Sequence, residues 1–132
     1  MATVELSAAL KSLGLSRGDL TASEDVAAGD FVNIHASSGA RIRKADASDD
    51  TRPADGFAAA AVLTGASGEV LLPGQVLSGL SGLAAGASYY LSETAGAITP
   101  TPPSGSGCLV QFVGKALSAT ELLFNPDRGV VL

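Results

Sequence analysis

Residues 83–97, LAAGASYYLSETAGA, form the stretch that most directly predicts the fold of this chain. A similar stretch, VAAGDFVNIHASSGA, occupies residues 26–40, and the two align without a gap. Both copies keep an AAG triplet near the start and a Gly-Ala pair at the end. Glycine suits tight turns because it adopts positive φ at little steric cost. Each copy is therefore predicted to form a turn, a strand and a second turn.

The segment between the two turns has the alternation that is typical of a β-strand. In the upstream copy, Val32 and Ile34 fall on one face, and Asn33 and His35 fall on the other. The downstream copy repeats this pattern: Tyr89 and Leu91 fall on one face, and Tyr90 and Ser92 fall on the other. The two copies together predict a duplicated β-hairpin scaffold.

The repeat predicts an all-β fold, a small β-barrel or β-sandwich with an internal pseudo-repeat over about residues 21–72 and 78–125. Residues 1–20 differ, because Leu6, Leu10 and Leu13 recur at helical spacing. We expect these residues to form a short helix or, alternatively, an extended arm. The expected organisation is thus an N-terminal segment, 1–20, followed by a β-domain, 21–132.

The remaining expected strands are placed by apolar runs between turn signals. Residues 98–103 contain three prolines and are expected at a sheet edge or in a loop. Gly56–Leu63 is apolar on both faces and is expected to be a buried strand packed closely on another backbone. The other expected strands are Thr21–Asp25, Phe31–Ala36, Ala40–Ala45, Gly68–Leu72, Cys108–Val113 and Glu121–Phe124. Gln75–Leu80 is expected to be a strand or a turn.

The composition is poor in both bulky and charged side chains. Aromatic residues make up 5% of the chain, and charged residues make up 16%, against roughly 25% in ordinary soluble domains. Two explanations stay open: the surface is covered by sister copies or a larger assembly, or it is rich in Ser, Thr and Gly. The formal net charge of −5 argues against nucleic acid as a partner.

Localisation signals are few. Charged residues interrupt positions 1–20, so we expect no signal peptide. The longest apolar run near the middle of the chain is too short to span a bilayer. We expect a protein that is made and kept soluble in a cytoplasm, with no membrane partner.

The residue types needed for catalysis or cofactor binding do not form a recognisable pattern. One His and one Cys cannot build a zinc site of the usual kind. The acidic loop Asp46–Asp55 lacks the ligand spacing of a calcium loop, and Gly114-Lys115 lacks the other residues of a phosphate loop. We expect no catalytic site, cofactor or metal. The basic trio Arg41, Arg43 and Lys44 is expected to pair with nearby carboxylates.

Five segments, taken in order, resemble the capsid decoration, or cement, proteins of tailed bacteriophages. They are AGDFVNI (28–34), RIRKADASDDTRPADGFAAAAV (41–62), LPGQV (72–76), GLAAGASYYLSETAGAIT (82–99) and VGKALSATELLFNP (113–126). The resemblance extends from about Ala28 to the end of the sequence. It implies an all-β structural subunit that is oligomeric on the particle and has no enzymatic activity.

The resemblance also implies partners. The chain would decorate and stabilise a phage capsid by binding the expanded shell. Its partners would be the major capsid protein and itself, as a homotrimer, and its location would be the virion after synthesis in the host cytoplasm. The expected contact residues are Val4, Leu6, Leu10 and Leu13.

Other functions stay open beside this one. A receptor- or glycan-binding module of a phage tail or head fibre would need an exposed aromatic platform, supplied by Tyr89, Tyr90 or phenylalanines. A bacterial structural oligomer without a virus is a third possibility. An enzyme is a fourth, although no catalytic pattern supports it.

Overall fold

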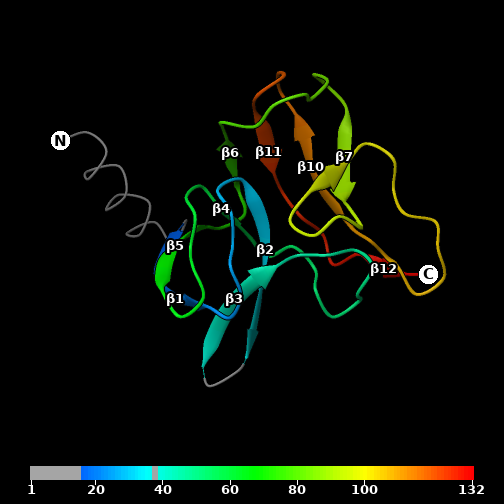
Figure 1. Cartoon of the computed structure of the whole chain (residues 1–132). Coiled ribbons are helices and arrows are strands. Elements are labelled where there is room, and N and C mark those ends of the chain that lie inside the picture. The colour runs from blue at the N-terminus through cyan, green and yellow to red at the C-terminus, as the bar shows by residue number, and fades with distance from the viewer. Residues whose placement is uncertain (1–15, 37–38) are drawn as a thin grey trace.

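The structure, a computed structural model, describes residues 16–36 and 39–132 as an all-β protein. Figure 1 shows a barrel on one side and a second sheet packed beside it. The expected all-β fold with an internal pseudo-repeat is confirmed. The expected helix or arm over Leu6–Leu13 lies outside the described residues.

The first unit is a closed five-stranded barrel with the strand order β1-β3-β2-β4-β5. The pairing of β1 with β5 is antiparallel, whereas β1 and β3 pair in parallel and complete the closure. The strands are β1 (Ser16–Ala22), β2 (Asp30–Ala36), β3 (Ala40–Lys44), β4 (Gly56–Ala58) and β5 (Ser67–Leu71).

The second unit is an open five-stranded sheet with the order β6-β11-β10-β7-β8. A separate ribbon pairs β9 with β12 in antiparallel fashion. The strands are β6 (Gln75–Leu77), β7 (Ser88–Leu91), β8 (Ile98–Thr99), β9 (Leu109–Val110), β10 (Phe112–Ala116), β11 (Leu122–Phe124) and β12 (Val130–Val131).

The two units have the same strand order. The sequence β3-β2-β4-β5-β1 around the barrel matches β8-β7-β10-β11-β6 in the second sheet. The register matches as well, because Val32 pairs with Gly56 in the first unit and Tyr89 pairs with Gly114 in the second. The units differ at one place: β1 pairs with β3, whereas their counterparts β6 and β8 are the two ends of an open sheet.

The AAG turns are also equivalent. Gly29 and Gly86 have φ values of 90° and 82°, as the predicted turn requires. The Gly29 N–H donates to the Ala58 carbonyl, and the Gly86 N–H donates to the Ala116 carbonyl, each at 2.7 Å. Each turn thus places the strand that follows it beside an equivalent partner: β2 pairs with β4, and β7 pairs with β10.

Several expected boundaries differ from the structure. The strand or turn expected over Gln75–Leu80 is a strand only as far as Leu77, and Gly79 then adopts positive φ. Strand β1 begins at Ser16 and crosses the boundary expected after residue 20, so Leu20 belongs to the barrel interior. The strand expected over Thr21–Asp25 therefore starts earlier and ends at Ala22. The buried strand expected over Gly56–Leu63 ends at Ala58, because the exposed methyl groups of residues 59–61 bury too little area to hold the chain in the sheet.

The strand expected over Cys108–Val113 is interrupted at Gln111. The Gln111 side chain is buried and forms a pair of hydrogen bonds with the backbone of Ala54. Its amide group also donates to the Asp127 carbonyl. The Gln111 side chain thus bonds the backbone of Ala54 as a neighbouring strand would, and it joins the loop before β4 to the second unit.

The interior has two apolar clusters. One fills the first barrel, and the other extends from the second sheet into the first unit. Members of the second cluster from the first unit are Phe31, Ala45, Ala47, Ala54 and Phe57. This shared cluster means that the two units bury part of their apolar surface against each other.

Two strand glycines allow neighbouring groups to approach closely. Close packing on another backbone was expected over Gly56–Leu63, but the nearest neighbour of Gly56 is a side chain; the close backbone approach is at Gly114, where it was not predicted. A Cβ atom added at Gly114 would lie 2.4 Å from the Leu123 carbonyl oxygen. At the equivalent Gly56, it would lie 2.4 Å from a methyl group of Val70. The clash at Gly114 is with backbone, which cannot move without disturbing the pairing of β10 and β11.

We therefore predict that Gly114→Ala destabilises the protein by about 1–3 kcal/mol, the usual cost of overpacking a filled interior. Urea unfolding followed by circular dichroism gives the free energy. The neighbouring Lys115→Ala, at an exposed position of the same strand, is the matched control and should stay within about 0.5 kcal/mol of wild type. Equal stability of the two variants would show that the backbones are not in close contact.

Candidate functional site

The expected contact residues Val4, Leu6, Leu10 and Leu13 lie outside the described part of the chain. Within residues 16–36 and 39–132, no three His, Cys, Asp or Glu side chains are grouped so that they could hold a metal ion. Over the same residues, no helix is both long and apolar enough to cross a membrane. The candidate sites are therefore a polar cluster on the first barrel and apolar surfaces on the second unit.

The polar cluster lies on the outer face of the β2–β3 hairpin. Asn33 is only 3% exposed there, because the loop between β3 and β4 covers it. Its amide group donates to the Pro53 carbonyl and to the Asp55 carboxylate, and it accepts a hydrogen bond from Arg43 at 2.9 Å. Arg43 also donates to the Thr51 carbonyl. These contacts hold the acidic loop against the hairpin.

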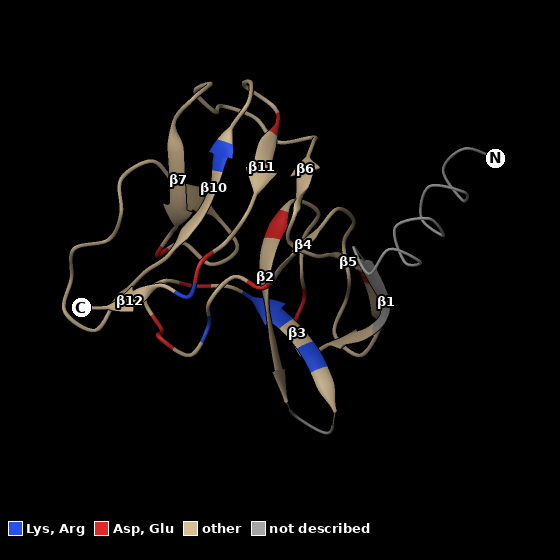
Figure 2. Cartoon of the chain, turned by 180° about the vertical axis from the view of Figure 1, so that it is seen from behind, with Lys and Arg blue, Asp and Glu red and all other residues tan. Residues whose placement is uncertain are grey.

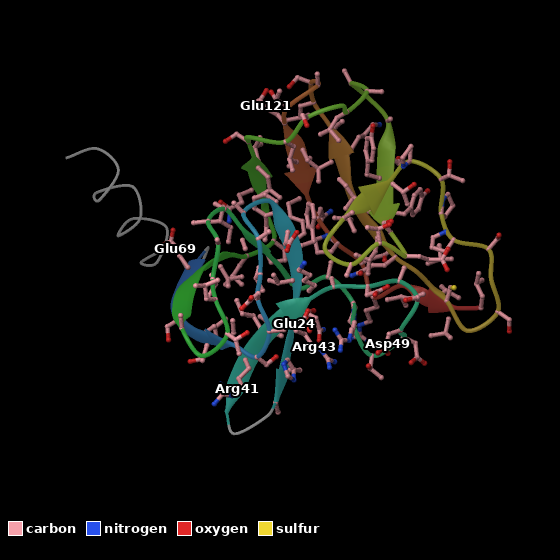
Figure 3. The ribbon with its side chains drawn as sticks, viewed as in Figure 1. Glu24, Arg41, Arg43, Asp49, Glu69 and Glu121 are labelled. Atoms are coloured by element: carbon pink, nitrogen blue, oxygen red, sulfur yellow. The ribbon has the colours of Figure 1, made fainter. Side chains whose placement is uncertain are left out.

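The basic residues of this region are largely paired within the chain. Lys44 lies 3.7 Å from Asp30, and Arg52 lies 3.4 Å from both Glu24 and Asp49. Figure 2 shows basic residues along β3, and Figure 3 labels Arg41, Arg43, Glu24 and Asp49 in this region. The expected pairing is confirmed for Lys44, whereas the contacts that hold Arg43 are amide and carbonyl oxygens. Partly exposed pairs of this kind contribute little to stability.

Burial raises the pKa of the Asp55 carboxyl above its ordinary value, despite hydrogen bonds from the Ile34 N–H and the Asn33 side chain. A raised folded pKa means that the native state holds this proton more tightly than the unfolded state. The stability from this effect is present below the unfolded pKa and is lost as the pH rises through the folded pKa. Asp55 therefore has a structural role, because its oxygen orders the start of β4 against β2.

His35 lies within hydrogen-bond distance of Ser23, at 2.9 Å, although nothing in the sequence linked the two residues. The arrangement is a poor nucleophile pair, because the Ser23 hydroxyl donates to the Ile42 carbonyl. Burial lowers the pKa of His35, and the nearby Arg43, Arg52 and Arg41 lower it further. The contact fastens the chain after β1 to the hairpin.

We predict that nuclear magnetic resonance titration of the one histidine will give a pKa below 6.5. At about 1 M salt, where the Debye length is about 3 Å, repulsion by the arginines is screened and the pKa should rise. It should not return fully to 6.5, because burial remains. Since the folded pKa is lowered, stability from this group is present above pH 6.5 and is lost as the pH falls. A His35 pKa that does not change with salt concentration would show that the arginines do not lower it.

The second unit carries exposed apolar side chains. Val76 on β6 pairs with Leu123 on β11, and they are 46% and 42% exposed. Val130 and Val131 on β12 are 66% and 52% exposed. Figure 2 shows that the second sheet carries little charge beyond Lys115 on β10. Such surfaces typically contact another protein or a further copy.

A cavity of about 380 Å³ opens where the second sheet fails to close. One wall is the segment after β6, and the other is β8 with the turn before it. Apolar side chains from both units contribute to the lining. Its lining includes Phe31, Leu80, Ser81, Leu83, Tyr89, Ile98 and Pro100.

This cavity was not predicted from the sequence. The two copies look equivalent over residues 26–40 and 83–97, and the difference lies just before them. The position that matches Ala22 is occupied by Gly79, which has a φ of 82°. The glycine at this position was the sequence signal for the open second unit, because a residue with positive φ ends the strand and redirects the chain.

Comparison with models of known protein families gives no match, and comparison with curated proteins gives none either.

Proposed function

We propose that this chain is a non-enzymatic structural protein of a phage particle, which decorates the capsid and stabilises its expanded shell. The observation that carries the proposal is the set of exposed apolar side chains on the second unit, on a chain of low charge. The resemblance in five ordered segments supplies the class of particle. The major capsid protein and sister copies, in a homotrimer, would be the partners.

Mass action explains how such binding would stabilise a shell. A ligand that binds only the expanded form stabilises it by RT ln(1 + [L]/Kd) at each site. Three linked subunits would bind with a raised effective concentration, so that weak individual contacts suffice. A rigid all-β subunit suits this role because little conformational entropy is lost when it binds.

The receptor- or glycan-binding alternative has less support. Phe31, Phe57, Phe124 and Tyr89 are buried, so they cannot form an aromatic platform at the surface. Tyr90 and Phe112 are partly exposed and pack edge to face at 6.1 Å, which leaves one small aromatic pair. A glycan array with no bound sugar would remove this alternative.

We predict that the protein cosediments with expanded shells assembled from the proposed partner, a phage major capsid protein, and not with unexpanded shells. Leu6→Asp should weaken binding about tenfold or more, because the contact would bury an unpaired carboxylate. Ser7→Asp adds the same charge off the predicted apolar stripe and is the matched control.

Deletion of residues 2–13 should also abolish shell binding and leave the fold intact, since β1 begins at Ser16. Deletion of residues 1–20 is unsuitable because it removes most of the strand that closes the barrel. Failure of the wild-type protein to bind expanded shells at micromolar concentration would argue against the proposed function.

A further inference from the structure

In the first unit, the pairing of β1 with β3 closes the sheet into a barrel. Thr21 and Ala22 of β1 pair in parallel with Arg41 and Ile42 of β3. The Ser23 N–H extends this pairing by donating to the Ile42 carbonyl at 2.9 Å. Backbone groups at the edges of both strands are thereby satisfied, and the apolar interior is covered.

The second unit lacks this closure for a local reason. Gly79 and Leu80 stand where the first unit has Ala22 and Ser23. Gly79 and Gly82 both adopt positive φ, and the Leu80 N–H donates to the Thr120 carbonyl instead of to β8. The edges of β6 and β8 therefore remain at the two ends of the sheet.

We call this gap the open seam; the lining residues Leu80, Ser81, Leu83, Tyr89, Ile98 and Pro100 define it. Its cavity of about 380 Å³ has room for side chains, and most of its lining side chains are apolar. Exposed polar groups line the cavity beside these apolar side chains. Among residues 16–36 and 39–132, β8 pairs only with β7, and an open strand edge beside a cavity is a template for a further strand. What the seam lacks is one short, apolar, extended segment.

Strand β12 has the properties of that segment. Val130, Val131 and Leu132 are 66%, 52% and 48% exposed, so side chains on both faces of the strand are uncovered. Just before β9, the Cys108 carbonyl accepts a hydrogen bond from the Leu132 N–H, and the Gly107 N–H donates to the Leu132 carbonyl. The alternation of an antiparallel ladder then turns the N–H and C=O of Val131 away from β9.

We infer that the open seam of one molecule binds the outer edge of β12 from a second copy. The apolar side chains of β12 fill the cavity, and its free backbone groups pair with an edge of the seam. Because the two surfaces differ, the contact is head-to-tail and closes into a ring when the rotation permits. This inference rests on the self-association within the proposed function and is independent of binding to a shell.

The first experiment measures self-association of the full chain by multi-angle light scattering and sedimentation velocity over a range of concentrations. Val131→Asp should raise the dissociation constant at least tenfold. Leu63→Asp is the matched control, because Leu63 is 64% exposed but belongs to the first unit, and it should associate like wild type. Circular dichroism checks that each variant is folded.

The second experiment tests the head-to-tail geometry. Ser81→Glu places a carboxylate in the exposed mouth of the seam and should also prevent self-association. The Val131→Asp variant keeps a normal seam, and the Ser81→Glu variant keeps a normal β12. An equimolar mixture should therefore form one-to-one complexes, although neither variant associates alone.

The outcomes separate this inference from the proposed function. If Val131→Asp associates like wild type, or if the mixture stays monomeric, the seam contact is wrong and self-association must use another surface. If wild type is monomeric at all concentrations, both the seam contact and the trimer are wrong. Shell binding is measured separately and is decided by neither result.

Discussion

The packing of Phe31 joins the two halves of the molecule. Phe31 belongs to β2 of the first unit, yet its ring lies 4.9 Å from Phe57 and 5.6 Å from Phe124, measured between centroids. Large aromatic side chains dominate core energetics, and this chain has few of them. Placing three of the four phenylalanines at the junction makes the interface between the units a main part of the core. The duplicated halves therefore form one connected structure.

Backbone hydrogen bonds reinforce this junction and position one wall of the open seam. The Phe31 N–H donates to the Gly96 carbonyl, and the Gly96 N–H donates to the Ala45 carbonyl. Gln111 joins the Ala54 backbone to the Asp127 carbonyl on the other side. The turn before β8, which forms one wall of the open seam, is thus held by the first unit. A seam wall fixed in this way loses little entropy when a strand binds to it.

Because the two units differ in closure, the surfaces suited to binding another protein lie mainly on the second unit. The closed barrel satisfies its strand edges internally, and its hairpin surface is covered by a hydrogen-bonded acidic loop. In the described part of the chain, β6 and β8 are the two ends of the second sheet, and Val76, Leu123 and the side chains of β12 are exposed. A subunit with one closed and one open unit suits assembly, because its exposed strand edge and apolar side chains lie on one part of the molecule.

The local pattern predicted many elements well. The AAG turns, the alternation over β2 and β7 and the edge position of Ile98–Thr99 are as expected. These features depend on neighbouring residues: glycine permits positive φ, alternation sets the two faces, and proline limits pairing. Errors occurred where a partner distant in sequence decides the outcome. Ser16 extends β1 because β5 lies beside it, and Gln111 interrupts a strand because Ala54 lies within reach of its side chain.

The sequence by itself determined the fold class, the repeat and the turns, because each follows from the conformational preferences of short segments. Tertiary structure alone decided which unit closes, how Phe31 links the cores, and how Asn33 and Arg43 hold the acidic loop. Closure depends on whether two strand edges meet in space, and the φ of Gly79 changes that meeting without altering the alternation around it. Apart from the glycine at position 79, a local pattern carries little sign of such long-range contacts, because their free energy comes from groups that only the folded chain brings together.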